Sequence, residues 1–152
     1  MKAGNYTESA TTPSMKNAIQ FGLLIGILSA LWIIVSDVLG LTKRLSNDIA
    51  PFEYTSGLIP LIGLYLGVRN FRNNYKGGEI NFFEAIAECF KILLIGGAIA
   101  AFSAFVYMQY FSTSGETTAI TDYSARLFGA LLIGVLFSLT VSILLMTKPR
   151  LL

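Results

Sequence analysis

Histidine is absent from this sequence of 152 residues, and cysteine occurs once, as Cys89. These absences exclude a zinc site of the usual Cys/His type, a disulfide within the chain and a catalytic triad that uses histidine. The sequence also lacks the motifs of phosphate loops, dinucleotide-binding turns, zinc metalloproteases and serine hydrolases. We therefore expect no enzymatic activity, no bound metal and no cofactor.

Charge is also scarce, since only 13% of the residues are charged, against about 25% in soluble domains. The net charge of +2 is small, and no basic run with interleaved aromatic residues indicates nucleic-acid binding. Four stretches carry no charge at all: residues 17–36, 54–68, 92–115 and 127–147. The sequence therefore predicts an integral membrane protein whose surroundings are the lipid bilayer.

Helices are the expected structure of these stretches, because an isolated strand would leave its backbone groups unpaired in hydrocarbon. The predicted fold class is all-α, with four transmembrane helices in a bundle. A single domain is expected over residues 12–150, after a polar tail of residues 1–11. The predicted helices cover about residues 13–40, 51–70, 82–111 and 122–147. A secretory signal peptide is the competing interpretation of the first one, but its apolar run is too long and no A-x-A pattern follows.

The second stretch is the weakest, because residues 54–68 would span only about 22 Å as a helix. A start at Pro51 and snorkelling of Arg69 and Arg72 bring it closer to full length. Pro60 lies in the middle of this segment and is expected to kink it. A re-entrant half-helix is the alternative.

Capping signals mark the starts of the last two helices. Asn81 with Glu84 three residues later resembles a capping box, and Gly77-Gly78 precedes it as a turn. Asp122 is the expected cap of the fourth helix, which Lys148-Pro149 should end.

The distribution of basic residues predicts the orientation. The end of the bundle that holds both termini and the middle loop has eight, against three on the opposite side, namely Lys43, Arg44 and Arg126. The eight are Lys2, Lys16, Arg69, Arg72, Lys76, Lys91, Lys148 and Arg150. By the positive-inside rule, both termini are expected in the cytoplasm of a bacterial inner membrane.

Small residues recur at intervals of four in each predicted helix, which places them on one face and lets neighbouring backbones approach closely. The helix-packing candidates are Gly22, Gly26, Gly63, Gly67, Gly134 and Ser138. Packing within the chain is the simplest interpretation. The alternative is that the Gly22/Gly26 face is exposed and forms a homodimer.

Glu84, Glu88 and Lys91 fall on one face of the third helix and are weak candidates for an ion or proton site. Glu88 is close enough in sequence to pair with Lys91. The simpler interpretation places all three at headgroup depth in the first turns, where Lys snorkels and carboxylates favour the positive end of the helix.

The chain resembles a domain-of-unknown-function family of small four-helix bacterial inner-membrane proteins that is abundant in Bacteroidetes. The most specific part is the segment G-G-x-I-x-F-x-x-A from Gly77 to Ala85. Further likeness lies in Leu31-Trp32, Ile59-Pro60 and a fourth helix rich in glycine and alanine. The family has a longer, often acidic segment where this chain has residues 112–123. The resemblance implies the fold and location, and it assigns no catalytic or binding residues.

Two functions remain open. The leading one is a non-enzymatic structural or accessory membrane subunit, supported by the small-residue faces, the short loops and the lack of charge at any midspan. Its partner would be a second copy of the chain or an unidentified membrane protein. The alternative is an oligomeric small-solute or ion transporter or channel, suggested by Pro60 in a glycine-rich second helix.

Overall fold

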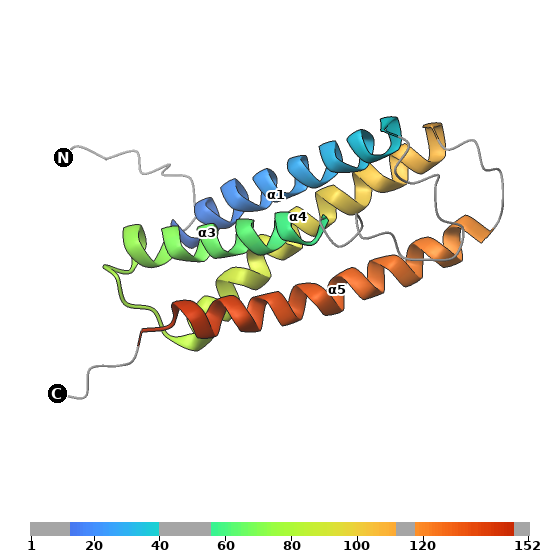
Figure 1. The fold of residues 1–152 in the computed structure, drawn as a ribbon. Coiled ribbons are helices and arrows are strands. Elements are labelled where there is room, and N and C mark those ends of the chain that lie inside the picture. Colours follow the sequence, from blue (N-terminus) through green and yellow to red (C-terminus); the bar gives the residue numbers. More distant parts are fainter. Residues whose placement is uncertain (1–12, 40–55, 112–117, 148–152) are drawn as a thin grey trace, which may run out of the picture.

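Four helices make up the fold of the computed structural model, which describes residues 13–39, 56–111 and 118–147. They are α1 (Pro13–Val38), α3 (Leu58–Tyr75), α4 (Phe82–Phe111) and α5 (Thr118–Leu145). The start of α1, the turn 76–81 and the end of α5 lie together at one end of the bundle, called here the basal end (Figure 1). The expected all-helical fold is confirmed.

Three of the helices are long and apolar enough to cross a membrane. The qualifying segments are Pro13–Ser36, Phe82–Tyr107 and Phe128–Leu145. α3 has only 18 residues, and its last two turns carry Arg69, Arg72 and three asparagines. The chain is therefore a membrane protein with at least three helices suited to spanning.

α3 differs from the helix expected over residues 51–70. It ends at Tyr75, five residues later than expected, and residues 51–55 lie outside the described part of the chain. Pro60 occupies the first turn instead of the middle, where a missing backbone donor costs little, so it is not the mid-helix kink that we expected. One tertiary and one local contact hold the extra turn. Arg72 Nη1 donates to the carbonyl of Leu145 on α5, and within α3 Phe71 stacks on Tyr75 at 5.9 Å between ring centroids.

The other helix ends lie close to the expected ones. α4 has the predicted bounds, α1 ends two residues early, and α5 begins four residues before Asp122, which is therefore not its cap. The turn after α3 reverses direction through Gly77 and Gly78, whose φ angles are +63° and +94°. Only glycine adopts such angles readily, so this pair closes the connection between α3 and α4.

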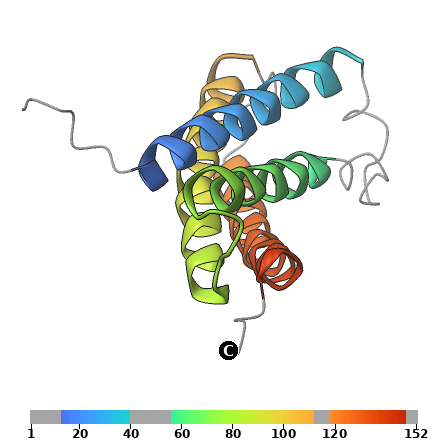
Figure 2. The same ribbon diagram turned by 90° about the vertical axis from the view of Figure 1, so that its left-hand side faces the viewer.

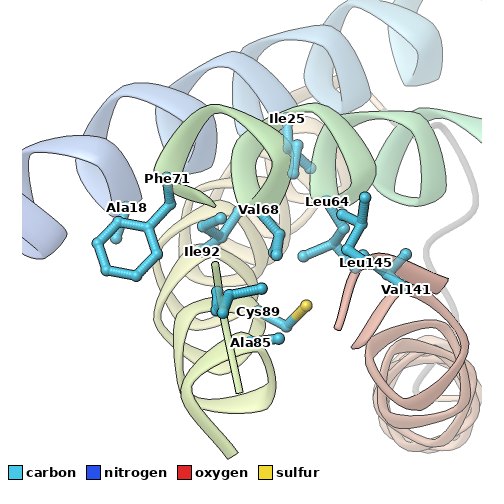
Figure 3. Close-up of a cluster of buried hydrophobic side chains, with 11 residues drawn as sticks. Ala18, Ile25, Leu64, Val68, Phe71, Ala85, Cys89, Ile92, Val141 and Leu145 are labelled. Atoms are coloured by element: carbon cyan, nitrogen blue, oxygen red, sulfur yellow. The ribbon is translucent and has the colours of Figure 1, made fainter. Parts of the chain in front are cut away.

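The buried core lies toward the basal end, where all four helices meet (Figure 3). Leu64 and Val68 of α3, Cys89 and Ile92 of α4 and Val141 of α5 are all nearly inaccessible. Figure 2 shows α1 lying obliquely across α4. The middle of α5 is different, because the side chains of Leu131, Leu132 and Ile133 are each about half exposed or more. Among the described residues, α5 is thus packed more closely at the basal end than at its middle, whereas α1 and α4 stay in contact beyond the core, as at Gly26 and Ile99.

Candidate functional site

Glu88 lies in the interior, between α4, α1 and α3, with none of its surface exposed. Its Oε2 accepts a hydrogen bond from Ser14 Oγ at 2.5 Å, and its Oε1 accepts one from Asn17 Nδ2 at 2.8 Å. Lys91 Nζ lies 3.4 Å from Oε2, one turn further along α4. A buried carboxylate is costly unless it is paired and hydrogen-bonded, and these three partners meet both conditions.

Ser14 connects the ammonium of Lys91 to the carboxylate of Glu88. Its hydroxyl donates to Glu88 and accepts a hydrogen bond of 2.6 Å from Lys91 Nζ. Ser14 lies in the first turn of α1, so its contact with Glu88 joins α1 to α4 through two residues that are 74 positions apart in the sequence. The side chain of Lys91 remains 42% exposed, which leaves the ammonium within reach of water or headgroups.

Asn17 joins α1 to α3 and to α4. Its Nδ2 donates to Glu88 on α4 and to the carbonyl of Gly67 on α3 at 3.1 Å. Its Oδ1 accepts from Asn70 Nδ2 at 2.9 Å, and Asn70 in turn accepts from Asn74 at 2.6 Å. Asn17 is fully buried and uses both ends of its amide, so one side chain fixes three helices.

Gly67 allows this close approach. A methyl group there would lie 2.7 Å from Cδ1 of Ile92 and 3.0 Å from Cγ of Phe21, closer than side chains tolerate. Any larger residue would therefore push α3 away and lengthen the contact between Asn17 and the Gly67 carbonyl. We call Ser14, Asn17, Asn70, Glu88 and Lys91 together the polar joint.

The structure separates Glu84 from the other two charged residues, Glu88 and Lys91, with which it was grouped on one face of α4. Glu84 belongs to the turn, where it accepts hydrogen bonds from Lys76 Nζ at 2.5 Å and from the backbone N–H of Asn81 at 3.2 Å. The second contact is half of the predicted capping box. Glu88 does pair with Lys91, and its side chain is buried inside the bundle against residues of α1. The expected depth of all three residues among the headgroups stays a prediction.

Sequence reasoning missed Ser14, Asn17 and Asn70. A signal for the first two was present, because positions i and i+3 share a helix face and both are polar at the start of an apolar run. The sequence held no sign that this face meets Glu88.

Cys89 follows Glu88 directly but faces α5. Its Sγ lies 3.9 Å from the carbonyl of Ser138 and 3.9 Å from Oγ of Ser142, and its surface is fully buried. At residues 88 and 89, α4 is thus covered on two sides, by the polar joint and by weak hydrogen bonds of Cys89 to α5. Cys89 is a free thiol inside the bundle.

The small residues named from the sequence all lie where helices meet. Methyl groups at Gly22 and Gly26 would lie 2.8 and 2.7 Å from the Cβ atoms of Ile95 and Ile99 on α4. Gly63 faces Ile25 of α1, and Gly134 faces Leu93 of α4. Ser138 is buried in α5 and bonds to its own helix, with Oγ donating to the Gly134 carbonyl. α4 of the same chain occupies the Gly22/Gly26 face that the homodimer alternative requires.

Two surface hollows lie among the described residues. A groove of about 370 Å³ between α1 and α3 is lined by Phe21, Leu66, Arg69, Asn70, Asn73 and Asn74. The second, of about 250 Å³, lies between α1 and α4 away from the basal end, with Ile33, Phe102 and Val106 in its walls. Neither is lined by Glu88. No group of three or more Cys, Asp or Glu side chains in the described part of the chain is arranged to hold a metal ion.

Comparison with known families gives a match over residues 20–121 to the family described as "Protein of unknown function (DUF4199)". The chain belongs to the DUF4199 family. This confirms the resemblance to a domain-of-unknown-function family. No curated protein and no solved structure matches the chain.

The DUF4199 match covers part of the polar joint. It includes Asn70, Glu88 and Lys91 on α3 and α4, whereas Ser14 and Asn17 precede it on α1. Most of α5 also follows the matched region. The acidic side of the joint therefore lies within the family segment, and its hydrogen-bond donors on α1 lie just outside.

Proposed function

We propose that this DUF4199 protein is a non-enzymatic structural or accessory subunit of the bacterial inner membrane. The observation that carries the proposal is that both oxygens of the buried Glu88 carboxylate are bonded within the bundle, Oε1 to Asn17 and Oε2 to Ser14 and Lys91. A reactive or transporting carboxylate needs an approach for its substrate. Here the carboxylate holds helices together instead.

The surroundings of Glu88 support this structural role. Neither surface hollow is lined by it, and among the described residues no buried side-chain nitrogen or oxygen lacks a hydrogen-bond partner. A satisfied buried network makes a rigid and specific contact, because each member would be costly to leave unpaired. The most charged part of the interior is thus occupied with holding α1, α3 and α4 in register.

The threading that we propose has four crossings, with the basal end in the cytoplasm. Lys16, Arg69, Arg72, Lys76 and Lys91 lie near this end, and an excess of basic residues favours the cytoplasmic side. α3 would cross as a short fourth helix of about 27 Å, with its basic last turns at the headgroups. A fluorescent protein fused after Leu152 should then be fluorescent in cells, and a fused alkaline phosphatase should be inactive. The opposite pair of results would reverse the orientation.

α5 supports a role as a subunit. Leu131, Leu132 and Ile133 point in three directions around the helix, since successive residues are about 100° apart, yet all three are exposed. The middle of α5 therefore offers an apolar surface over about 200° of its circumference, to lipid or to a neighbouring transmembrane helix, while Gly134 on the remaining side packs against Leu93 of α4.

The test is isolation of the tagged full chain from its native membrane in mild detergent, followed by quantitative mass spectrometry. We expect a reproducible membrane partner that is lost with L131W and L132W. L144W is the matched control, because Leu144 is 66% exposed on the basal half of the same helix. Two differently tagged copies in the same preparation would identify the partner as a second copy. A solitary chain, or equal loss with L144W, contradicts the proposal.

Proton or ion transport at Glu88 and Lys91 is the second candidate. Lys91, Ser14, Glu88 and Asn17 form a continuous chain of hydrogen bonds from the surface to the interior. The chain continues only through asparagine amides, which donate hydrogen bonds but do not release protons, so it would end as a proton path at Asn17. Flux into proteoliposomes that is lost with E88Q at unchanged folding would favour this candidate over the structural one.

A further inference from the structure

The groove between α1 and α3 combines an apolar wall with a basic, amide-rich wall. Phe21 of α1 and Leu66 of α3 form the apolar part. Arg69, Asn73 and Asn74 follow on the same face of α3, at the spacings that place residues above one another on a helix. Leu66 and Asn73 are separated by about 10 Å along the axis. The groove therefore changes from apolar to polar along the axis of α3.

The polar part of the groove offers donors and positive charge. No acidic side chain lines it. The nearest buried acid, Glu88, is already paired with Lys91. No hydrogen bond or ion pair joins Arg69 to another residue that the structure describes, and its side chain is exposed. Its guanidinium thus keeps all its donors for a ligand.

The asparagines are oriented in a way that suits an anion. Asn73 Oδ1 accepts from Arg72 Nε at 3.1 Å, which leaves the amide NH₂ of Asn73 as a donor. Asn74 uses its Nδ2 on Asn70, and Asn70 uses its own on Asn17, so the floor beneath Arg69 is held in place by the polar joint. The exposed guanidinium of Arg69 and the amide of Asn73 therefore extend from a helical turn that these asparagine contacts hold in place.

We propose that this groove binds the phosphate headgroup of an anionic phospholipid. Arg69 and Asn73 would hold the phosphate oxygens, since arginine forms strong charge-assisted hydrogen bonds with phosphate. An acyl chain would lie along Phe21 and Leu66, whose apolar surface a soluble anion would not use. Basic sites between membrane helices at the cytoplasmic surface suit such headgroups. The proposal depends on the membrane location and not on the proposed role as a subunit.

The test uses the full chain in mild detergent and measures binding of phosphatidylglycerol, with phosphatidylcholine and inorganic phosphate as separate probes. We expect phosphatidylglycerol to bind more tightly than phosphatidylcholine. R69Q should weaken its binding about tenfold, the loss expected for one charge-assisted hydrogen bond. K16Q is the matched control, because Lys16 is an exposed cation of α1 that does not line the groove.

Each other outcome overturns the proposal. Equal binding of the two lipids would show no headgroup preference, and equal weakening by K16Q would show attraction to the overall charge only. Displacement of the lipid by inorganic phosphate at similar concentrations would identify a site for free phosphate. The thermal unfolding of R69Q without lipid must be unchanged, so that weaker binding reflects the lost guanidinium. If R69Q does not fold, N73L tests the same site and should also weaken the binding of phosphatidylglycerol.

Discussion

Asn17 on α1 donates a hydrogen bond of 2.8 Å to Glu88 on α4, although 71 residues separate them, and neither side chain reaches the surface. The same Asn17 amide group also bonds to α3 through the Gly67 carbonyl. A single buried amide therefore sets the relative positions of three helices. Its loss would take their hydrogen-bond partner from Oε1 of Glu88 and Nδ2 of Asn70, and would remove the contact of α1 with the Gly67 carbonyl.

Substitution of Asn17 by leucine should destabilise the bundle. We expect N17L to lower the free energy of unfolding by about 1 to 3 kcal/mol, the cost of leaving buried polar groups unpaired. Unfolding in a denaturing detergent, followed by circular dichroism, measures it. N73L is the control for an exposed asparagine and should change stability by less than about 0.5 kcal/mol.

A double-mutant cycle tests whether the two residues act as one unit. The effects of N17L and E88L should not add, because each removes the partner of the other, and the coupling energy should exceed about 0.5 kcal/mol. Additive effects would mean that the contact between Asn17 and Glu88 contributes little to the fold.

The close contact between α1 and α4 should not accept a methyl group at Gly26. G26A places Cβ 2.7 Å from Cβ of Ile99, an atom next to the backbone, so the helices must separate. We expect a loss of about 1 to 3 kcal/mol, typical of overpacking, measured by the same unfolding assay. Gly97 provides the matched control on α4, because a methyl group there meets nothing within 4 Å. Equal stability of the two variants would contradict the observed packing.

The turn between α3 and α4 should resist substitution for a different reason. A methyl group at Gly78 would meet nothing within 4 Å, but the φ of +94° is unfavourable for any residue with a Cβ. G78A should cost about 1 to 2 kcal/mol, whereas G129A, in open space on helical α5, should cost nothing. Unfolding midpoints measured side by side decide this, and a neutral G78A would contradict the turn geometry.

Thiol labelling can report both burial and orientation. Cys89 is fully buried, so it should react with a maleimide only after unfolding, and it cannot report the orientation of the chain in the membrane. A cysteine at Phe83, which is 81% exposed near the basal end, can do so. F83C should react with a membrane-impermeant maleimide in inverted vesicles and not in intact cells. Labelling in intact cells would place the basal end outside.

The prediction of the second helix shows where sequence patterns reach their limit. The apolar run up to Val68 was recognised, but the helix continues to Tyr75 through a polar stretch with no spanning character. Those residues remain helical because Arg72 reaches the end of α5 and Asn74 bonds to Asn70. Pro60 was placed at mid-helix because nothing local showed that α3 begins at Leu58.

The sequence by itself determined that the protein lies in a membrane and that its fold is all-helical. The scarcity and spacing of charge excluded a soluble domain, and the need to pair backbone groups in hydrocarbon required helices with small residues at their contacts. Tertiary structure alone decided which polar groups meet. Glu84 and Glu88 are equivalent in a helical pattern, yet one bonds to a lysine in the turn and the other to α1. The physical reason is that the relative positions of the helices are set by close contacts far apart in sequence, such as that of Gly67 with Ile92, and no local pattern encodes these.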